Sequence, residues 1–134
     1  MNVKQRIVVG MTLMAIFTSA MAHHSFSSFD FSKSILIKGT VKEWQLTNPH
    51  TWIYVSVQKG GTVEEWHVEL GSSANLFRTG LRRDSLKPGD KIELLVHPLR
   101  TGLPGGALAG VKSVNGAPPP VGLLGDLGNR PTTK

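Results

Sequence analysis

The chain has 134 residues, of which 15 are Lys or Arg, 9 are Asp or Glu and none is Cys. The lack of cysteine excludes disulfide bonds, thiolate metal sites and cysteine-based catalysis, so a core of apolar side chains has to hold the fold. The formal net charge of +6 favours adhesion to anionic surfaces. The basic residues are scattered along the chain, and this distribution does not indicate nucleic acid binding.

The first 22 residues have the three-part layout of a secretory signal peptide. Lys4 and Arg6 precede an apolar segment at residues 7–17 that is too short to anchor the chain in a membrane, and Ala20 and Ala22 are the small residues that the peptidase requires. We therefore predict cleavage after Ala22 and a periplasmic or secreted protein with no stable membrane anchor. Removal of two basic residues lowers the net charge to +4 and leaves 112 residues, the size of one domain.

Residues 34–114 alternate apolar and polar side chains with the period of two that is typical of β-strands. The predicted strands cover residues 34–44, 51–58, 63–70, 91–99 and 106–114, with a short helix at 74–78 that Ser72 or Ser73 caps. Three strands, a helix and two strands predict an all-β fold, a small five-stranded Greek-key barrel of the oligonucleotide/oligosaccharide-binding (OB) type. Residues 23–33 then form an amino-terminal arm. Residues 115–134, rich in Pro and Gly, are predicted to be a disordered tail.

The paired glycines Gly60 and Gly61 predict a two-residue hairpin and thereby a register for the second and third strands. In this register the residue numbers of opposed pairs sum to 121, so Tyr54 faces His67 and Trp52 faces Glu69. His50 lies diagonal to Glu69 on the same face. The opposite face is apolar and, with Trp66 and Val68, is predicted to be the core. No cleft is indicated beside the polar face.

Cleavage after Ala22 would leave His23 with a ring nitrogen and a free α-amine, which together can chelate a metal ion. We predict that His23, His50 and His67 bind a divalent metal, copper(II) or less selectively zinc, because the donors are nitrogens without sulfur. His24, Trp52, Tyr54 and Glu69 are predicted as further residues of the ligand-binding face. A terminal histidine of this kind is similar to the histidine brace of copper monooxygenases and of some periplasmic copper carriers.

A structural interpretation of the same residues needs no metal. In it, His67 stacks on Tyr54, His50 caps a turn after Pro49, and Phe26 and Phe29 fasten the arm over Trp52. His97 is predicted to be only the end of a strand.

No complete set of nucleophile, base and orienting group is found, and the protein is predicted to be a non-enzymatic binding module. The alternative is a structural or interaction protein of the cell envelope that binds a glycan or a protein partner without metal. Nucleic acid is not expected as a partner, because acidic residues alternate with the aromatic ones on the polar face. The oligomeric state is left open.

Several short motifs lie between Ala22 and Leu99: His23-His24-Ser25-Phe26, Phe29-Asp30, Gly39-Thr40-Val41, Asn48-Pro49-His50, Trp66 with Glu69, and Leu86-Lys87-Pro88-Gly89-Asp90. Together they resemble one family of small exported bacterial proteins, the domain of unknown function 6152. Leu81 departs from the pattern, which has tryptophan after the glycine. The resemblance implies export and a compact β-domain, and it implies no reaction.

Overall fold

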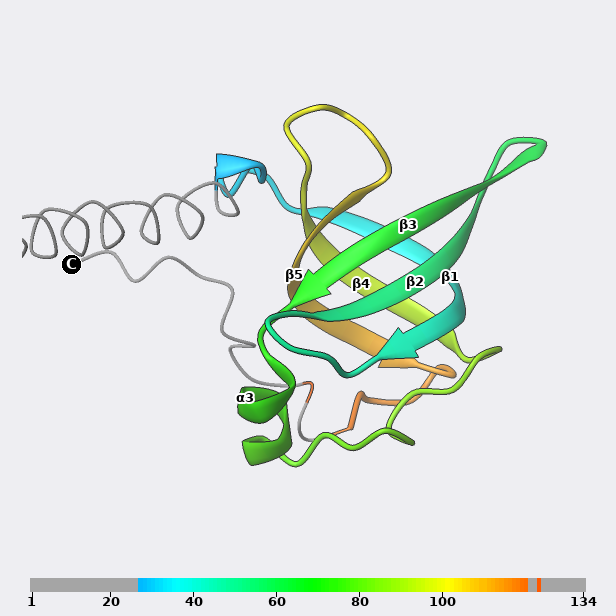
Figure 1. The fold of residues 1–134 in the computed structure, drawn as a ribbon. Helices are drawn as coiled ribbons and strands as arrows, with labels where there is room; N and C mark the ends of the chain where they lie inside the picture. Colours follow the sequence, from blue (N-terminus) through cyan, green and yellow to red (C-terminus); the bar gives the residue numbers. More distant parts are fainter. Residues whose placement is uncertain (1–26, 121–122, 124–134) are drawn as a thin grey trace, which may run out of the picture.

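The computed structural model describes residues 27–120 and residue 123. Its elements are β1 (Ile35–Gln45), β2 (Thr51–Lys59), β3 (Thr62–Leu70), α3 (Ser73–Arg78), β4 (Lys91–Pro98) and β5 (Gly105–Val114). The five strands close a barrel in the order β1-β2-β3-β5-β4 (Figure 1). The prediction of an all-β, five-stranded barrel with one short helix between the third and fourth strands is therefore confirmed. The predicted signal peptide, His23 and His24 lie outside the described residues.

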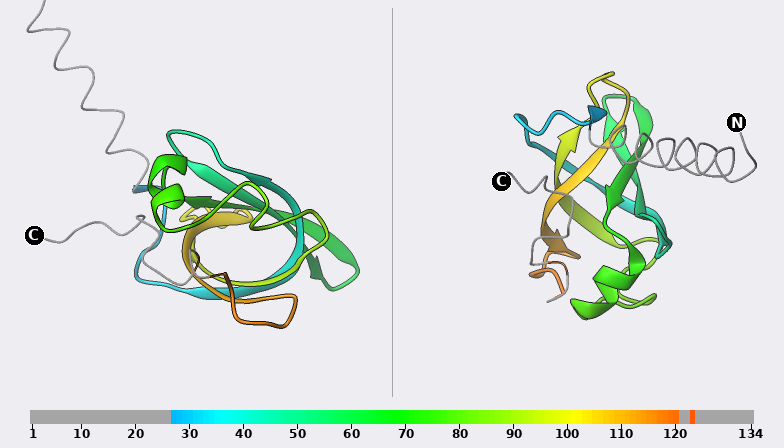
Figure 2. Two further views of the ribbon diagram at one scale, coloured as in Figure 1. Left: turned by 90° about the horizontal axis from the view of Figure 1, so that it is seen from below. Right: turned by 60° about the vertical axis from the view of Figure 1, so that its left-hand side comes forward.

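The length of β1 lets one strand join two neighbours, and this closes the barrel. Its first half, from Ile35 to Thr40, pairs with β4, and its second half, from Thr40 to Gln45, pairs with β2. The strand passes close to β2 at Gly39, where an added Cβ would lie 2.4 Å from the carbonyl oxygen of Ser56. An end-on view shows the resulting ring of strands (Figure 2).

The hairpin between β2 and β3 has the predicted register. Lys59 pairs with Thr62, Tyr54 with His67 and Trp52 with Glu69, and Gly60 adopts the positive φ (60°) that a two-residue turn requires. The apolar face points inward, and its Val68 is completely buried. Trp66, also predicted as core, is only partly buried and packs against the core from its margin.

The barrel closes where β5 runs parallel to β3 over a short stretch, with His67, Val68 and Glu69 opposite Gly105, Gly106 and Ala107. The fifth strand has few large side chains, so its neighbours can approach it closely. At Gly106 an added Cβ would lie 2.1 Å from the carbonyl oxygen of His97 on β4. The two glycines therefore allow a tight approach of three strands at this point.

The helix α3 and the segment after it lie at one end of the barrel (Figures 1 and 2). The Ser72 side chain caps the helix by accepting a hydrogen bond from the amide of Asn75. Leu76 on the helix and Leu81 and Leu86 after it belong to the main core. No helix in the described part of the chain is long and apolar enough to cross a membrane.

The tail that was predicted to be disordered from Asn115 begins with ordered contacts. Ala117 pairs with Val114, and the Leu123 side chain is 1 % exposed within the main core. Residues 121, 122 and 124–134 of the predicted tail lie outside the described residues.

Candidate functional site

A groove of about 630 Å³ lies between the outer face of the β2–β3 hairpin and two segments from elsewhere in the chain. It is lined by His50 and Trp52 from β2 and its preceding loop, by Glu65, His67 and Glu69 from β3, by Ser28 and Phe29 from the arm, and by Leu99, Leu103 and Pro104 from the β4–β5 loop. The structure thus brings His50, Trp52, His67 and Glu69 to one groove. Tyr54 lies beside this group, in contact with His67.

The arm forms one wall of the groove because its backbone pairs with the chain after β4. Phe29 forms a β-bridge with Leu99, and the amide of Arg100 donates to the carbonyl of Ser28 at 2.9 Å. The Phe29 side chain is buried. The first described residues are therefore held firmly against the β4–β5 loop.

Asp30 stabilises the turn that leads from the arm to β1. Its carboxylate accepts hydrogen bonds from the amide and the hydroxyl of Ser32 and forms an ion pair with Lys33 at 3.0 Å. The Ser32 hydroxyl, followed by Lys33, lowers the pKa of Asp30 to about 2. The turn is thus held by a carboxylate that stays ionised at all ordinary pH values.

His50 forms an ion pair with Glu69 inside the groove, with its Nδ1 atom 2.9 Å from Oε1. Glu69 is only 7 % exposed; burial raises the pKa of its carboxyl group, whereas the nearby His50 acts in the opposite direction. When Nδ1 carries the proton toward Glu69, the Nε2 atom of a neutral ring keeps its lone pair.

The loop before β2 fixes the position of His50. The Thr47 hydroxyl donates to the carbonyl of His50 at 2.6 Å, and the Ser73 hydroxyl donates to the side chain of Asn48 at 2.9 Å. The Asn48–Pro49 peptide bond is cis. The turn cap expected from His50 thus comes from its backbone carbonyl, and its ring faces Glu69 instead.

His67 has a different acidic partner. Its Nε2 atom lies 3.2 Å from Oε1 of Glu65, and Glu65 also binds Lys42, whose hydrogen bond lowers the pKa of the carboxyl group. The His67 ring meets Tyr54 edge-on, with 4.8 Å between ring centroids. The structural interpretation predicted that His67 stacks on Tyr54. The two rings are in contact as predicted, but edge to face and not stacked.

The described residues alone do not form a metal site. Across 27–120 and 123, no three His, Cys, Asp or Glu side chains are grouped so that they could hold a metal ion. His97 ends β4 as predicted, and its Nδ1 atom lies 2.7 Å from the carbonyl oxygen of Lys33. His23 and His24, which were predicted beside His50 and His67 for the ligand-binding face, precede the described residues.

The model of a family of unknown function, DUF6152, matches residues 11–108. The chain belongs to this family. No curated protein is significantly similar in sequence to it. The match includes every residue that lines the groove, so the groove is a feature of the DUF6152 domain and not of an added segment.

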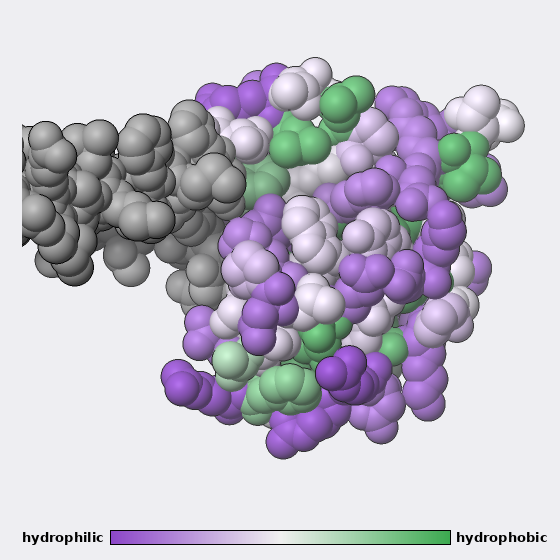
Figure 3. Space-filling model, in the orientation of Figure 1, coloured by the Kyte–Doolittle hydropathy of each residue, from purple (hydrophilic) through white to green (hydrophobic). Residues whose placement is uncertain are grey.

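Sequence reasoning missed the second wall of this DUF6152 groove. Ser28, Leu103 and Pro104 belong to segments without strand periodicity, and Leu99 is the last residue of a predicted strand. The arm and the segment after β4 lie far apart in the chain. One available signal was Leu103, a large apolar residue between Gly102 and Pro104 in a turn. It is 63 % exposed. Apolar side chains near the arm and this loop form one of several apolar areas visible on this face (Figure 3).

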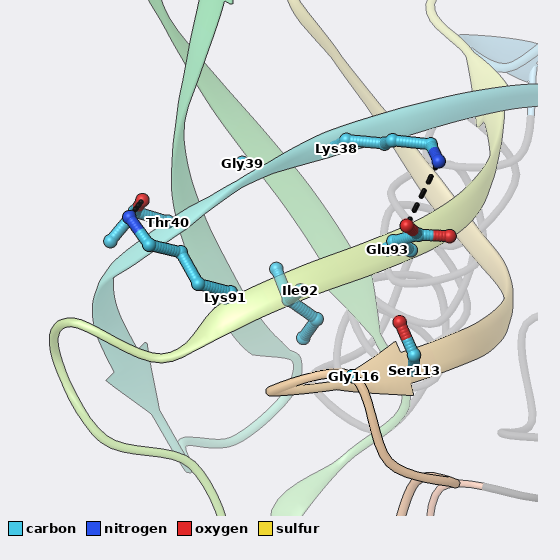
Figure 4. Close-up of a pocket in the computed structure, with 8 residues that line it drawn as sticks. All are labelled: Lys38, Gly39, Thr40, Lys91, Ile92, Glu93, Ser113 and Gly116. Carbon is cyan, nitrogen blue, oxygen red and sulfur yellow. Dashed lines mark hydrogen bonds and ion pairs between the residues drawn. The ribbon is translucent and has the colours of Figure 1, made fainter.

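A second hollow of about 320 Å³ lies outside β1 and β4 and was also not foreseen (Figure 4). At one end Lys38 forms an ion pair with Glu93 at 2.9 Å, and at the other end Lys91 donates to the Thr40 hydroxyl at 2.8 Å. Because Glu93 offsets the charge of Lys38, the hollow lacks the concentrated positive charge of an anion-binding site.

Proposed function

We propose that the protein is an exported, non-enzymatic binding module whose ligand lies in the groove between β2–β3 and the arm. The ligand that we propose is a divalent metal, copper(II) in preference to zinc. The donors would be the α-amine and ring of His23 together with His50 and His67.

The position of the arm is the observation that carries this proposal. Ser28 lines the groove, and only residues 23–26 separate the predicted new terminus from Ser27. Four extended residues span at most about 14 Å. The terminal histidine is therefore tethered within reach of the wall that holds His50.

The partner of His50 adds chemical support. Histidines that bind metals commonly donate their second ring N–H to a carboxylate, which fixes the tautomer and the ring orientation. Glu69 occupies this place relative to Nδ1 of His50, which leaves Nε2 for a metal. His67 would bind through Nδ1, since its Nε2 faces Glu65.

Copper titration of two purified proteins tests the proposal. One begins at His23, and the other carries a single extra glycine before His23, which removes the chelating amine. We expect affinity at least tenfold weaker for the extended protein. Binding should also weaken below pH of about 6.5, because the metal must displace protons from imidazole.

Variants of single histidines locate the site. His50→Ala and His67→Ala should weaken copper binding, and His97→Ala, whose ring lies outside the groove, should not. Equal copper affinities of the two proteins would rule out the amino-terminal chelate. Absence of copper binding by both proteins would rule out the metal proposal.

The apolar lining favours a second candidate, binding of an envelope glycan or protein partner without metal. Phe29, Trp52, Leu99 and Leu103 line the groove, whose volume falls in the range of roughly 300–1,000 Å³ that organic ligands occupy. Trp52 offers a ring on which a sugar could stack. Perturbation of the Trp52 indole NMR signal by envelope glycan fragments, with EDTA present, would support this candidate over metal.

A further inference from the structure

The groove is much larger than a single metal ion requires, and its walls differ in chemistry. The side formed by the arm and the β4–β5 loop is apolar, with Phe29, Leu99 and Leu103, and the hairpin side carries Trp52 and the carboxylates of Glu65 and Glu69. An occupant that matches both sides has one large apolar group and one positive charge. It also has the size of a small organic molecule or a short peptide.

We propose that in the metal-free protein the groove is occupied by the protein's own processed terminus, residues 23–26. The phenyl ring of Phe26 packs against the apolar side, and the terminal ammonium of His23 faces Glu69. Like the proposed function, this inference rests on cleavage after Ala22, but it does not require a metal.

The direction of the arm supports this occupant. Ser27 and Ser28 are held by Arg100, whose Nε donates to the carbonyl of Ser27 at 3.1 Å and whose amide donates to that of Ser28. Ser28 itself lines the groove. Phe26 is therefore attached directly to a segment fixed at the groove, so its docking loses less chain entropy than the docking of a separate molecule.

The amino terminus carries a charge complementary to the carboxylates of the groove only after the signal peptide is removed. Glu65 already pairs with Lys42, and the buried Glu69 lies beside the His50 ring on the floor of the groove. A terminal amine is mostly protonated at pH 7 and adds a full positive charge. In the uncleaved chain the same nitrogen is a neutral amide. Removal of the leader thus creates the group that completes the fit.

A double-mutant cycle in EDTA tests the proposal. The protein that begins at His23 and the one with an extra glycine before His23 are compared in three backgrounds: unchanged, Glu69→Gln, and Glu93→Gln. Glu93 lies outside the barrel beside Lys38 (Figure 4), so its variant is the matched control. We expect the extension to lower the melting temperature by several degrees in the unchanged and Glu93→Gln proteins and to have little effect in Glu69→Gln.

Proton NMR of the same proteins gives a readout that does not depend on stability. Nuclear Overhauser contacts from the Phe26 ring to the Trp52 indole and the Leu103 methyl groups are expected in the processed protein and should weaken strongly in the extended one. A Phe26 ring without contacts to the groove, or contacts that appear only in dimers at high concentration, would overturn the proposal. Copper binding without these contacts would leave the metal proposal standing alone, and the contacts without copper binding would support only the docked terminus.

Discussion

His50 and His67 share one face of the hairpin, yet each is held by a different carboxylate. Glu69 is buried and pairs with His50, whereas Glu65 is exposed and shares its charge between His67 and Lys42. The two rings therefore differ in which nitrogen faces a carboxylate. Their contributions to ligand binding should differ as well, with His50 the better oriented of the two.

The neighbouring residues Val68 and His67 test the register of the hairpin. Val68→Asp should unfold the domain, because an unpaired buried carboxylate costs several kcal/mol, comparable to the total stability of a small domain of about 5–15 kcal/mol. Val68 is 0 % exposed. Circular dichroism during thermal unfolding measures the effect.

His67→Ala is the control for that substitution, since its side chain points away from the core and is 53 % exposed. It should melt within a few degrees of the unchanged protein when metal is absent. A Val68→Asp protein that melts normally, or a His67→Ala protein that unfolds, would contradict the observed register.

At the scale of elements, the strands could be predicted from sequence because local signals define them. The alternation of side chains gives the strand bounds to within one residue, and Gly60 and Gly61 fix the register of β2 and β3. The face shared by His50, Trp52, His67 and Glu69 follows from that register.

The groove could not be predicted in the same way. Its second wall depends on the pairing of Phe29 with Leu99, two residues that are distant in sequence, the first in the arm and the second at the end of the predicted fourth strand. No local pattern reports such a contact. The sequence therefore identified the polar face of the site but not the cavity beside it.

The packing of β5 against its neighbours gives a prediction for this element. Gly106→Ala should destabilise the protein by about 1–3 kcal/mol or more, because the added Cβ would lie 2.1 Å from a backbone oxygen that cannot move alone. Gly110→Ala, on the same strand, is the control, since an added Cβ meets nothing within 4 Å there. Denaturant unfolding compares the two, and equal losses would contradict this close approach.

At the scale of the whole molecule, the barrel core extends beyond the strands. Leu76, Leu81, Leu86 and Leu123 all belong to the same core as the strand residues. Composition alone suggested a structureless tail after residue 114, because Pro and Gly are frequent and apolar residues lack a period. One buried leucine in such a segment has no local signature, so its role appears only in three dimensions.

Leu123→Ala tests this contribution of the tail. Truncation of a fully buried leucine should cost about 2–5 kcal/mol, and Leu123 is 1 % exposed. Leu36→Ala removes the same atoms at a position that is 48 % exposed and should change the unfolding free energy by no more than about 0.5 kcal/mol. If the two variants were equally stable in urea, the tail would not belong to the core.

The short parallel contact between β3 and β5 makes one side of the barrel weaker than the others. The β2–β3 pairing runs from Thr51 to Lys59, whereas β3 and β5 meet only at residues 67–69 and 105–107. This seam should open first in local fluctuations, and its amides should exchange with deuterium fastest among the barrel strands. His67 and Glu69 lie in the seam and also line the groove. A ligand that contacts both residues and the β4–β5 loop would hold β3 and β5 together. The amides of the seam would then exchange with deuterium more slowly, and this change would report occupancy of the groove before the ligand is identified.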